Sequence, residues 1–236
     1  MAENLGGAGG FATGIKLAVH EGADWIWLMD DDAMPAQDAL EKLLQPPLDE
    51  SCVYGSIAVG DNSDHLCWPV ETDTGKKLNT LDDLYAPRIP VSFHPFLGFF
   101  INRQLVEKAG LPDSSFFLSG DDVEYCLRCG HHGGKVFLCR DSKLKHPMPP
   151  RKSISIFELR INLLVQPPQR AYYNTRNKIV IARRYYGNRL WTQTMPGIFI
   201  RLLLSSIFGP NRLGQLKAYF IAIFHGFADK MGKFTV

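Results

Sequence analysis

The chain has 236 residues, of which 45% are hydrophobic and 21% are charged, and these fractions exclude a chain too polar to bury a core. The net charge at neutral pH is only +2, but this average conceals a division along the chain. Residues 1–150 hold 12 Lys and Arg against 22 Asp and Glu, whereas residues 151–236 hold 14 against 2. We therefore expect an acidic domain over residues 1–150 with a cation site, and a basic region over residues 151–236 that faces an anionic partner.

The first predicted element follows a glycine-rich segment, Asn4 to Phe11, which we interpret as a turn that leads into a helix over Gly14 to Glu21. Glycines ahead of a helix allow main-chain N–H groups to approach a phosphate or a ribose closely. A glycine loop alone is a weak signal, but this one lies shortly before a cluster of acids.

Three consecutive aspartates, Asp30, Asp31 and Asp32, follow the apolar run from Trp25 to Met29. Such a run is typical of a buried strand, and ligands of open α/β sheets bind at the C-terminal ends of the strands. Crowded carboxylates repel one another, so a bound cation would stabilise them. The pattern predicts a hard divalent ion that holds a phosphate-bearing substrate. The alternative is a solvated acidic turn in which Asp32 or Asp38 caps the next helix.

Helices and strands are predicted to follow one another in the middle of the chain. We expect helices over residues 37–44 and 105–109, and strands over residues 53–59, 93–101 and 135–139. Residues 60–90 are polar with little periodicity, which favours a long loop or an irregular hairpin over the site.

A second acidic cluster, Asp121 and Asp122, precedes a helix that is expected to end near Gly130. A carboxylate at a helix N-terminus beside a metal–phosphate site can act as a general base toward an attacking hydroxyl. Capping and the helix dipole also favour acids at this position, which is the structural alternative. His146 could complete a set of Asp, Asp and His ligands, because neutral imidazole suits Mn²⁺.

The five cysteines are an odd set with no secretory signal before them, which indicates reduced thiols in a cytosolic protein. Cys126 and Cys129, with His131, His132 and Cys139, resemble zinc-ligand spacing, but their segment looks helical and a second C-x-x-C pair is missing. Zinc is therefore the weaker interpretation.

The basic region has two apolar stretches, Ile198 to Phe208 and Ala218 to Phe227, both shorter than the roughly 20 residues that span a bilayer. With their basic surroundings they predict helices that lie on an anionic membrane surface. The alternative is a pair of helices that cover the sheet. Nucleic-acid binding is disfavoured, because these apolar stretches are not typical of a basic groove that binds a phosphate backbone.

Taken in order, these motifs resemble the family 2 inverting glycosyltransferases with a GT-A fold, especially galactofuranosyl- and rhamnosyltransferase-like members. The resemblance rests on N-x-G-G-A-G-G-F from Asn4, on the strand that ends in D-D-D, on G-D-D-V-E-Y-x-L-R from Gly120, and on a later histidine. It covers most of residues 4–150 and continues more weakly through residues 172–177 and 226–233. It implies an α/β fold, with a GT-A (Rossmann-like) mixed sheet flanked by helices and a C-terminal helical extension.

The resemblance also implies roles for individual residues. Asp30 and Asp32 would match the D-x-D motif that binds Mg²⁺ or Mn²⁺ at the donor diphosphate, with His146 as an additional metal ligand. Asp122 would match the catalytic base, with Asp121 as its neighbour. The implied donor-binding residues are Asn4, Gly6, Gly7, Gly9, Asp31 and Arg176. The expected donor is a UDP- or dTDP-sugar, with galactofuranose or rhamnose as the sugar, and the expected acceptor is a glycan or glycolipid.

Members of this family usually begin with a strand–helix–strand unit ahead of the glycine loop, whereas this chain starts three residues before Asn4. We therefore expect an N-terminally truncated sheet, as in a fragment, in a degraded copy or in a chain completed by a partner. The leading hypothesis is an enzyme at the cytoplasmic face of the membrane. The alternatives are an inactive relative that serves as a membrane-associated or interaction module, and a metal-dependent phosphohydrolase or nucleotidyltransferase.

Overall fold

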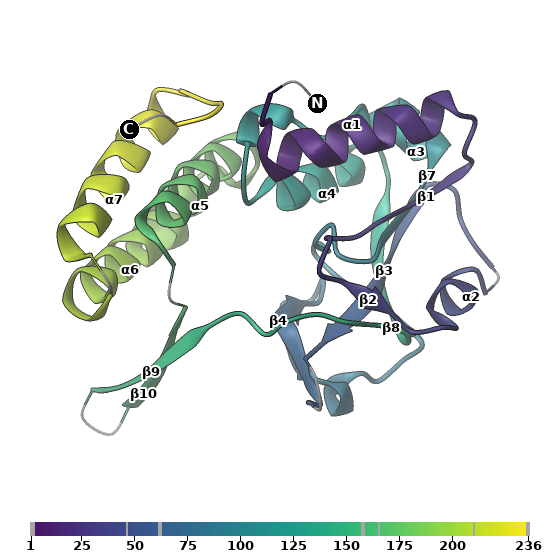
Figure 1. Ribbon diagram of the computed structural model, residues 1–236, viewed down its shortest axis with the longest axis horizontal. Coiled ribbons are helices and arrows are strands. Elements are labelled where there is room, and N and C mark those ends of the chain that lie inside the picture. Colours follow the sequence, from purple (N-terminus) through teal and green to yellow (C-terminus); the bar gives the residue numbers. More distant parts are fainter. Residues whose placement is uncertain are drawn as a thin grey trace. The chain divides into compact units, whose positions relative to one another are not determined.

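The structure is a computed structural model that describes residues 3–45, 47–60, 63–156, 159–164, 166–209 and 211–234 (Figure 1). The chain divides into two compact units. The sheet unit comprises residues 9–113 and 122–148, and the C-terminal unit comprises residues 1–8, 114–121 and 149–236. The division at residue 149 lies beside the domain end predicted at residue 150, but the C-terminal unit also includes two earlier segments.

The sheet unit is built on an eight-stranded mixed sheet. Its strand order is β1 (Trp25–Leu28), β7 (Phe99–Asn102), β3 (Cys52–Val59), β4 (His65–Glu71) and β5 (Lys77–Thr80). The long strand β8 (Lys135–Lys145) runs parallel to β3 and pairs antiparallel with β2 (Met34–Pro35) and β6 (Arg88–Pro90). Among the described strands, β1 stands at the end of the order and pairs with β7 alone.

Side chains that alternate along β3 fill two cores, one on each face of the sheet. Val53 faces one cluster of apolar side chains, and Tyr54 faces the other. The first cluster includes residues of α1 (Gly6–His20), α3 (Arg103–Ala109) and α4 (Asp121–His131). The second cluster includes Leu43 of α2 (Ala39–Leu43). The unit therefore consists of helices on both faces of a mixed sheet.

Most predicted elements are present, and two differ from the prediction. The strand predicted over residues 93–101 begins only at Phe99, as β7. The glycine-rich segment predicted as a turn is helical from Gly6, because Ala8, Ala12 and Ile15 recur at helical spacing and are buried. Residues 60–90, predicted as a long loop or an irregular hairpin, contain such a hairpin, the antiparallel pair β4 and β5, whose register shifts between His65 and Val70. A 3₁₀ turn, Leu81–Asp83, follows β5.

The C-terminal unit begins with a two-stranded ribbon, β9 (Arg151–Ile156) and β10 (Leu159–Leu164), and continues as helices. These are α5 (Pro168–Ile181), α6 (Met195–Phe208) and α7 (Arg212–Phe227), with two π-helical segments, Ala182–Tyr186 and Leu190–Thr194, between α5 and α6. Figure 1 shows α5, α6 and α7 in green to yellow beside one another. Helices were predicted in this region, whereas the ribbon of β9 and β10 was not.

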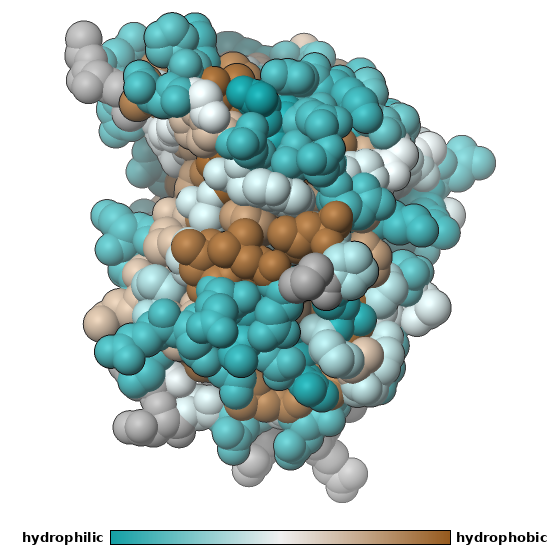
Figure 2. Space-filling model, turned by 90° about the vertical axis from the view of Figure 1, so that its right-hand side faces the viewer, coloured by the Kyte–Doolittle hydropathy of each residue, from teal (hydrophilic) through white to brown (hydrophobic). Residues whose placement is uncertain are grey.

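Apolar side chains also reach the surface of the sheet unit. Met34 of β2 and Leu40 and Leu44 near α2 are exposed. Figure 2 shows the side of the molecule on which α2 lies, and a brown apolar patch lies near its centre between two teal polar regions. Within the described part of the chain, each helix is too short or too polar to cross a membrane.

Among the glycines of α1, Gly6 is the one whose replacement should lower the unfolding free energy most. Its φ is +70°, and an added Cβ would lie 2.0 Å from the carbonyl oxygen of Phe117, so a side chain there meets strain and a main-chain clash. We expect Gly6→Ala to lower the thermal unfolding midpoint, with a loss of roughly 1–3 kcal/mol in unfolding free energy. Gly7→Ala is the matched control, because an added Cβ there has nothing within 4 Å. Equal midpoints for the two variants would contradict this prediction.

Candidate active site

The acidic turn after β1 is held in place by main-chain hydrogen bonds. The N–H of Gly98 donates to the carbonyl of Leu28 at 2.8 Å, and the N–H of Ala33 donates to the carbonyl of Asp30 at 3.2 Å. The chain then enters β2, where Met34 pairs with Lys145 of β8. This register brings the turn next to the residue that follows β8, which is His146.

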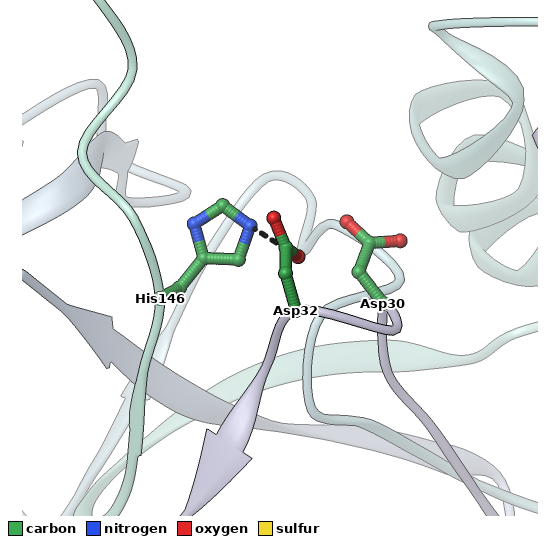
Figure 3. A group of neighbouring side chains, drawn as sticks. All are labelled: Asp30, Asp32 and His146. Atoms are coloured by element: carbon green, nitrogen blue, oxygen red, sulfur yellow. Dashed lines mark ion pairs between the residues drawn. The ribbon is translucent and has the colours of Figure 1, made fainter.

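Asp30, Asp32 and His146 form a cluster (Figure 3). Each offers one ligand atom, and these three atoms lie within 4.8 Å of one another. The Nε2 atom of His146 is 3.1 Å from Oδ1 of Asp32. The two carboxylates are exposed and the imidazole is largely buried, so a cation could enter from solvent between them.

The imidazole of His146 is oriented by its surroundings. Its Nδ1 lies 2.7 Å from the carbonyl oxygen of Pro147, which can only accept a hydrogen bond. Nδ1 therefore carries a proton, and in the neutral ring the lone pair is on Nε2, the atom that faces Asp32. The ring also packs against Trp68 at a centroid distance of 4.9 Å, and the His146 N–H donates to the carbonyl of Val59 at 3.0 Å.

The donor set fits a divalent cation of the Mg²⁺ or Mn²⁺ class. Two carboxylates supply hard oxygen ligands, and the imidazole, with its second nitrogen bonded to a carbonyl, has the orientation typical of metal-binding histidines. Asp31 lies in the same turn with an exposed side chain and is outside the cluster.

The second acidic pair lies where the sequence places it, at the start of α4. Asp121 is buried, with 7% of its surface exposed, whereas Asp122 is partly exposed and its Oδ1 accepts a hydrogen bond from the N–H of Val123 at 2.8 Å. Of the two, Asp122 therefore has the carboxylate that a substrate hydroxyl can reach more readily.

The rest of this motif anchors α4 to the end of α3. Glu124 is buried and forms an ion pair with Arg128 at 2.8 Å, and Arg128 also donates to the carbonyls of Ala109 and Leu111 at 2.8 and 2.9 Å. The Tyr125 hydroxyl donates to the carbonyl of Gly110 at 2.9 Å. Glu124, Tyr125 and Arg128 of the D-D-V-E-Y-x-L-R motif thus fix α4 to the end of α3. The two aspartates lie at the N-terminus of α4.

The loop ahead of Asp121 is strained and tightly held within the C-terminal unit. Phe117 and Ser119 have φ values of 63° and 66°, a left-handed conformation that is uncommon outside glycine. The Asn177 side-chain amide donates to the carbonyls of Phe116, Leu118 and Ser119 at 3.1, 2.9 and 2.6 Å.

Arg176 supports the same loop. Its guanidinium is fully buried and donates to the carbonyls of Phe116 and Gly232 at 2.8 and 2.7 Å, and Gly232 in turn donates its N–H to the carbonyl of Ser115 at 2.7 Å. These contacts are structural, and the donor-binding role of Arg176 stays a prediction. The sequence signal was Arg176-Asn177 itself, but sequence alone could not show which carbonyls the two side chains reach.

The other predicted donor-binding residues lie near the start of the chain. The Asn4 side chain accepts a hydrogen bond from the N–H of Gly6 at 2.9 Å, so it caps the first turn of α1. Gly7 and Gly9 follow within that helix, and Gly9 is buried. Their role toward a donor stays a prediction.

The cysteines that resembled zinc ligands are buried thiols. Burial raises the pKa of Cys129 to about 12 and that of Cys139 to about 11. Cys126 is also buried, its pKa lies well above the usual value because of desolvation, and its sulfur lies 3.4 Å from the His94 N–H. These surroundings oppose thiolate formation, which zinc binding requires.

Comparison with known proteins relates these features to a family. Residues 1–110 match the family model described as glycosyl transferase family 2. A galactofuranosyltransferase, GlfT1 of Mycolicibacterium smegmatis, is 33% identical over 153 residues, which cover 61% of this chain and 51% of that protein. The match to glycosyl transferase family 2 covers just under half of this chain.

Two further relatives of this chain differ in the sugar that their names specify. GlfT1 of Mycobacterium tuberculosis is 33% identical over 161 residues, 61% of this chain and 49% of that protein. The dTDP-rhamnosyl transferase RfbF of Shigella flexneri is 24% identical over 188 residues, 78% of this chain and 62% of that protein. The chain spans about half the length of the galactofuranosyltransferases that it matches.

A solved structure shares the fold. The crystal structure of GalNAc-T7 with UDP, GalNAc and Mn²⁺ aligns with a TM-score of 0.52 at 11% sequence identity, over 95% of this chain and 41% of that one. The predicted fold class, a GT-A mixed sheet flanked by helices, is confirmed for this chain.

Proposed function

We propose that the chain is a metal-dependent inverting glycosyltransferase that moves a sugar from a nucleotide-sugar to a glycan or lipid-linked acceptor. The observation that carries this proposal is the cluster of Asp30, Asp32 and His146, which lies at the C-terminal end of β1 in a chain whose residues 1–110 match the glycosyl transferase family 2 model. The relatives named above favour galactofuranose or rhamnose as the sugar, and a UDP- or dTDP-sugar as the donor.

The proposed reaction assigns different tasks to the two acidic clusters. Asp122 takes the proton from an acceptor hydroxyl, whose oxygen then forms a bond to the anomeric carbon on the face opposite the leaving diphosphate. Asp30, Asp32 and His146 would hold Mg²⁺ or Mn²⁺. When bound, that cation would neutralise the negative charge that develops on the nucleoside diphosphate as the old glycosidic bond breaks.

The main chain at the start of α1 is the proposed contact for the donor. The first N–H groups of a helix have no intrahelical acceptor and carry a partial positive charge, which suits a phosphate or ribose oxygen. Asn4, Gly6, Gly7 and Gly9 supply this segment, and Asp31 would contribute from the acidic turn. Arg176 is left out because its guanidinium bonds to main-chain carbonyls.

The metal site is tested by titration of Mn²⁺, and of UDP and dTDP with and without Mn²⁺, in a calorimeter. We expect Asp32→Asn or Asp30→Asn to weaken Mn²⁺ binding by at least the roughly 10–100-fold that is typical of losing a supporting group around a metal, and to remove metal-dependent UDP binding. Asp38→Asn is the matched control, since Asp38 is an exposed aspartate of the same unit that lies outside the cluster and makes no side-chain cap hydrogen bond. Unchanged Mn²⁺ affinity in the Asp30 and Asp32 variants would refute the site.

The proposal includes a location at the cytoplasmic face of a membrane, as a peripheral protein. The support is the charge of residues 151–236, 14 Lys and Arg against 2 Asp and Glu, together with apolar helices in that region. A positive surface of this kind is attracted to anionic lipids over a distance of about one Debye length.

A further inference from the structure

Helix α7 of the C-terminal unit presents an apolar stripe to solvent. Leu213, Phe220 and Phe224 have 80%, 62% and 69% of their surfaces exposed. With Lys217 they are spaced by four, three and four residues, which places all four side chains on one face of the helix. Single exposed apolar side chains are common on protein surfaces. Large ones that line up along one face of a helix mark an interaction surface.

The neighbouring helix α6 carries a second stripe of the same kind. Phe199, Ile200, Leu203 and Ile207 are all exposed, with 54%, 59%, 60% and 45% of their surfaces in contact with solvent. Their spacing again matches one face of a helix. The two helices contact each other, so both stripes belong to one packed body.

A groove lies beside the α7 stripe. Its volume is about 540 Å³, and it is lined by residues of α7 and of the segment that follows: Lys217, Phe220, Ile221, Phe224, His225, Lys230 and Phe234. Three phenylalanines give the groove an apolar wall, and two lysines supply positive charge to it. The His225 side chain is fixed there, because its Nδ1 lies 2.7 Å from the Tyr172 hydroxyl.

We infer that the α7 stripe, Leu213, Lys217, Phe220 and Phe224, with the adjoining groove, docks on an anionic phospholipid bilayer. The phenylalanines and Leu213 would enter the boundary between headgroups and acyl chains, while Lys217 and Lys230 would contact lipid phosphates. This inference deepens the membrane location in the proposed function and rests on that part of it alone.

Charge decides between a bilayer and a second copy of the chain. The stripe contains Lys217, has Arg212 beside it, and adjoins Lys230 in the groove. Asp229, the nearby acid, lies 3.7 Å from Arg184, which compensates its charge. Two copies of such a surface would place like charges against each other, whereas an anionic leaflet is complementary to it.

The test is co-sedimentation with vesicles of phosphatidylcholine, with and without phosphatidylglycerol. We expect the whole chain to bind only the anionic vesicles, and the double variant Phe220→Ser with Phe224→Ser to bind them about tenfold or more weakly. Lys217→Glu should weaken binding to a similar degree and reduce its dependence on salt. Leu17→Ser and Lys108→Glu are matched controls, since Leu17 is 58% exposed and Lys108 is also exposed, and both lie outside the stripe.

The possible outcomes distinguish the docking inference from the transferase proposal. If the whole chain fails to bind anionic vesicles while it still binds UDP with Mn²⁺, the docking surface is wrong and the transferase proposal stands. If it binds vesicles but the stripe variants bind as well as the controls, this inference is wrong. Sedimentation velocity would overturn it in favour of self-association if the stripe variants convert a dimer into a monomer. If the chain binds vesicles but does not bind UDP, the docking inference stands and the transferase proposal is refuted.

Discussion

Asp122→Asn should abolish sugar transfer while leaving the binding of Mn²⁺ and of UDP unchanged. The amide cannot take the proton of the acceptor hydroxyl, and the loss of a positioned general base lowers turnover by roughly 10²–10⁴-fold. The substitution keeps the oxygen that accepts the hydrogen bond from the Val123 N–H, so the start of α4 should be retained. Turnover with a UDP- or dTDP-sugar and binding by calorimetry should both be measured, on the same protein sample.

Asp141→Asn is a matched control for this experiment. Asp141 is an exposed aspartate of the same unit, on β8, and its carboxylate pairs with Arg140 at 3.1 Å. An exposed pair of this kind contributes little to stability, so the variant should behave as the unaltered chain. If Asp122→Asn also retains full turnover, then Asp122 is not the base. Loss of Mn²⁺ binding in Asp122→Asn would instead indicate a disturbed site.

Arg176→Met should destabilise the chain strongly, although a methionine is close to arginine in length and suits an apolar interior. The guanidinium is fully buried and donates to the carbonyls of Phe116 and Gly232. The substitution would remove this donor from Gly232 and leave Phe116 with the Asn177 amide. Removing a group from a buried hydrogen-bond network costs roughly 3–5 kcal/mol in unfolding free energy. The measurement is the denaturant midpoint, together with turnover of the folded variant.

A change on the same stretch of chain supplies the control for Arg176. Arg183 is exposed and donates one hydrogen bond, to the carbonyl of Gly226 at 3.0 Å, so Arg183→Met should lower the unfolding free energy by roughly 1 kcal/mol or less. A donor-binding arginine would show the opposite pattern, with stability retained and UDP affinity lost. That result for Arg176→Met would restore the role that the sequence suggested.

The acidic turn shows how much local pattern can reveal. A strand of apolar residues followed by three aspartates predicted both the strand and its polar end, and β1 ends at Leu28. The companion residue, His146, was predicted from its ligand chemistry and from the family resemblance, and no local spacing linked it to the aspartates. Its approach to Asp32 depends on the pairing of β2 with β8, a contact between segments more than a hundred residues apart that no local period encodes.

Two other elements show where local reasoning failed. Glycine is a poor helix former, so the segment from Asn4 to Phe11 was predicted to be a turn. Burial of Ala8, Ala12 and Ile15 outweighed that propensity, and α1 begins at Gly6. Local pattern also could not show which groups Arg176 contacts: the family resemblance assigned it to the donor, and the carbonyls that it contacts come from segments about 60 residues away in sequence.

The end of the described chain returns to the loop that leads to Asp121, and this has a genetic consequence. Gly232 exchanges hydrogen bonds with Ser115 and Arg176, and the Phe234 ring stacks on Tyr172 at 4.1 Å. A premature stop codon only a few positions before codon 232 would therefore be expected to act as a loss-of-function allele. Milder substitutions among these residues are the places to seek temperature-sensitive alleles, in which the loop opens on warming while the acidic turn after β1 remains intact.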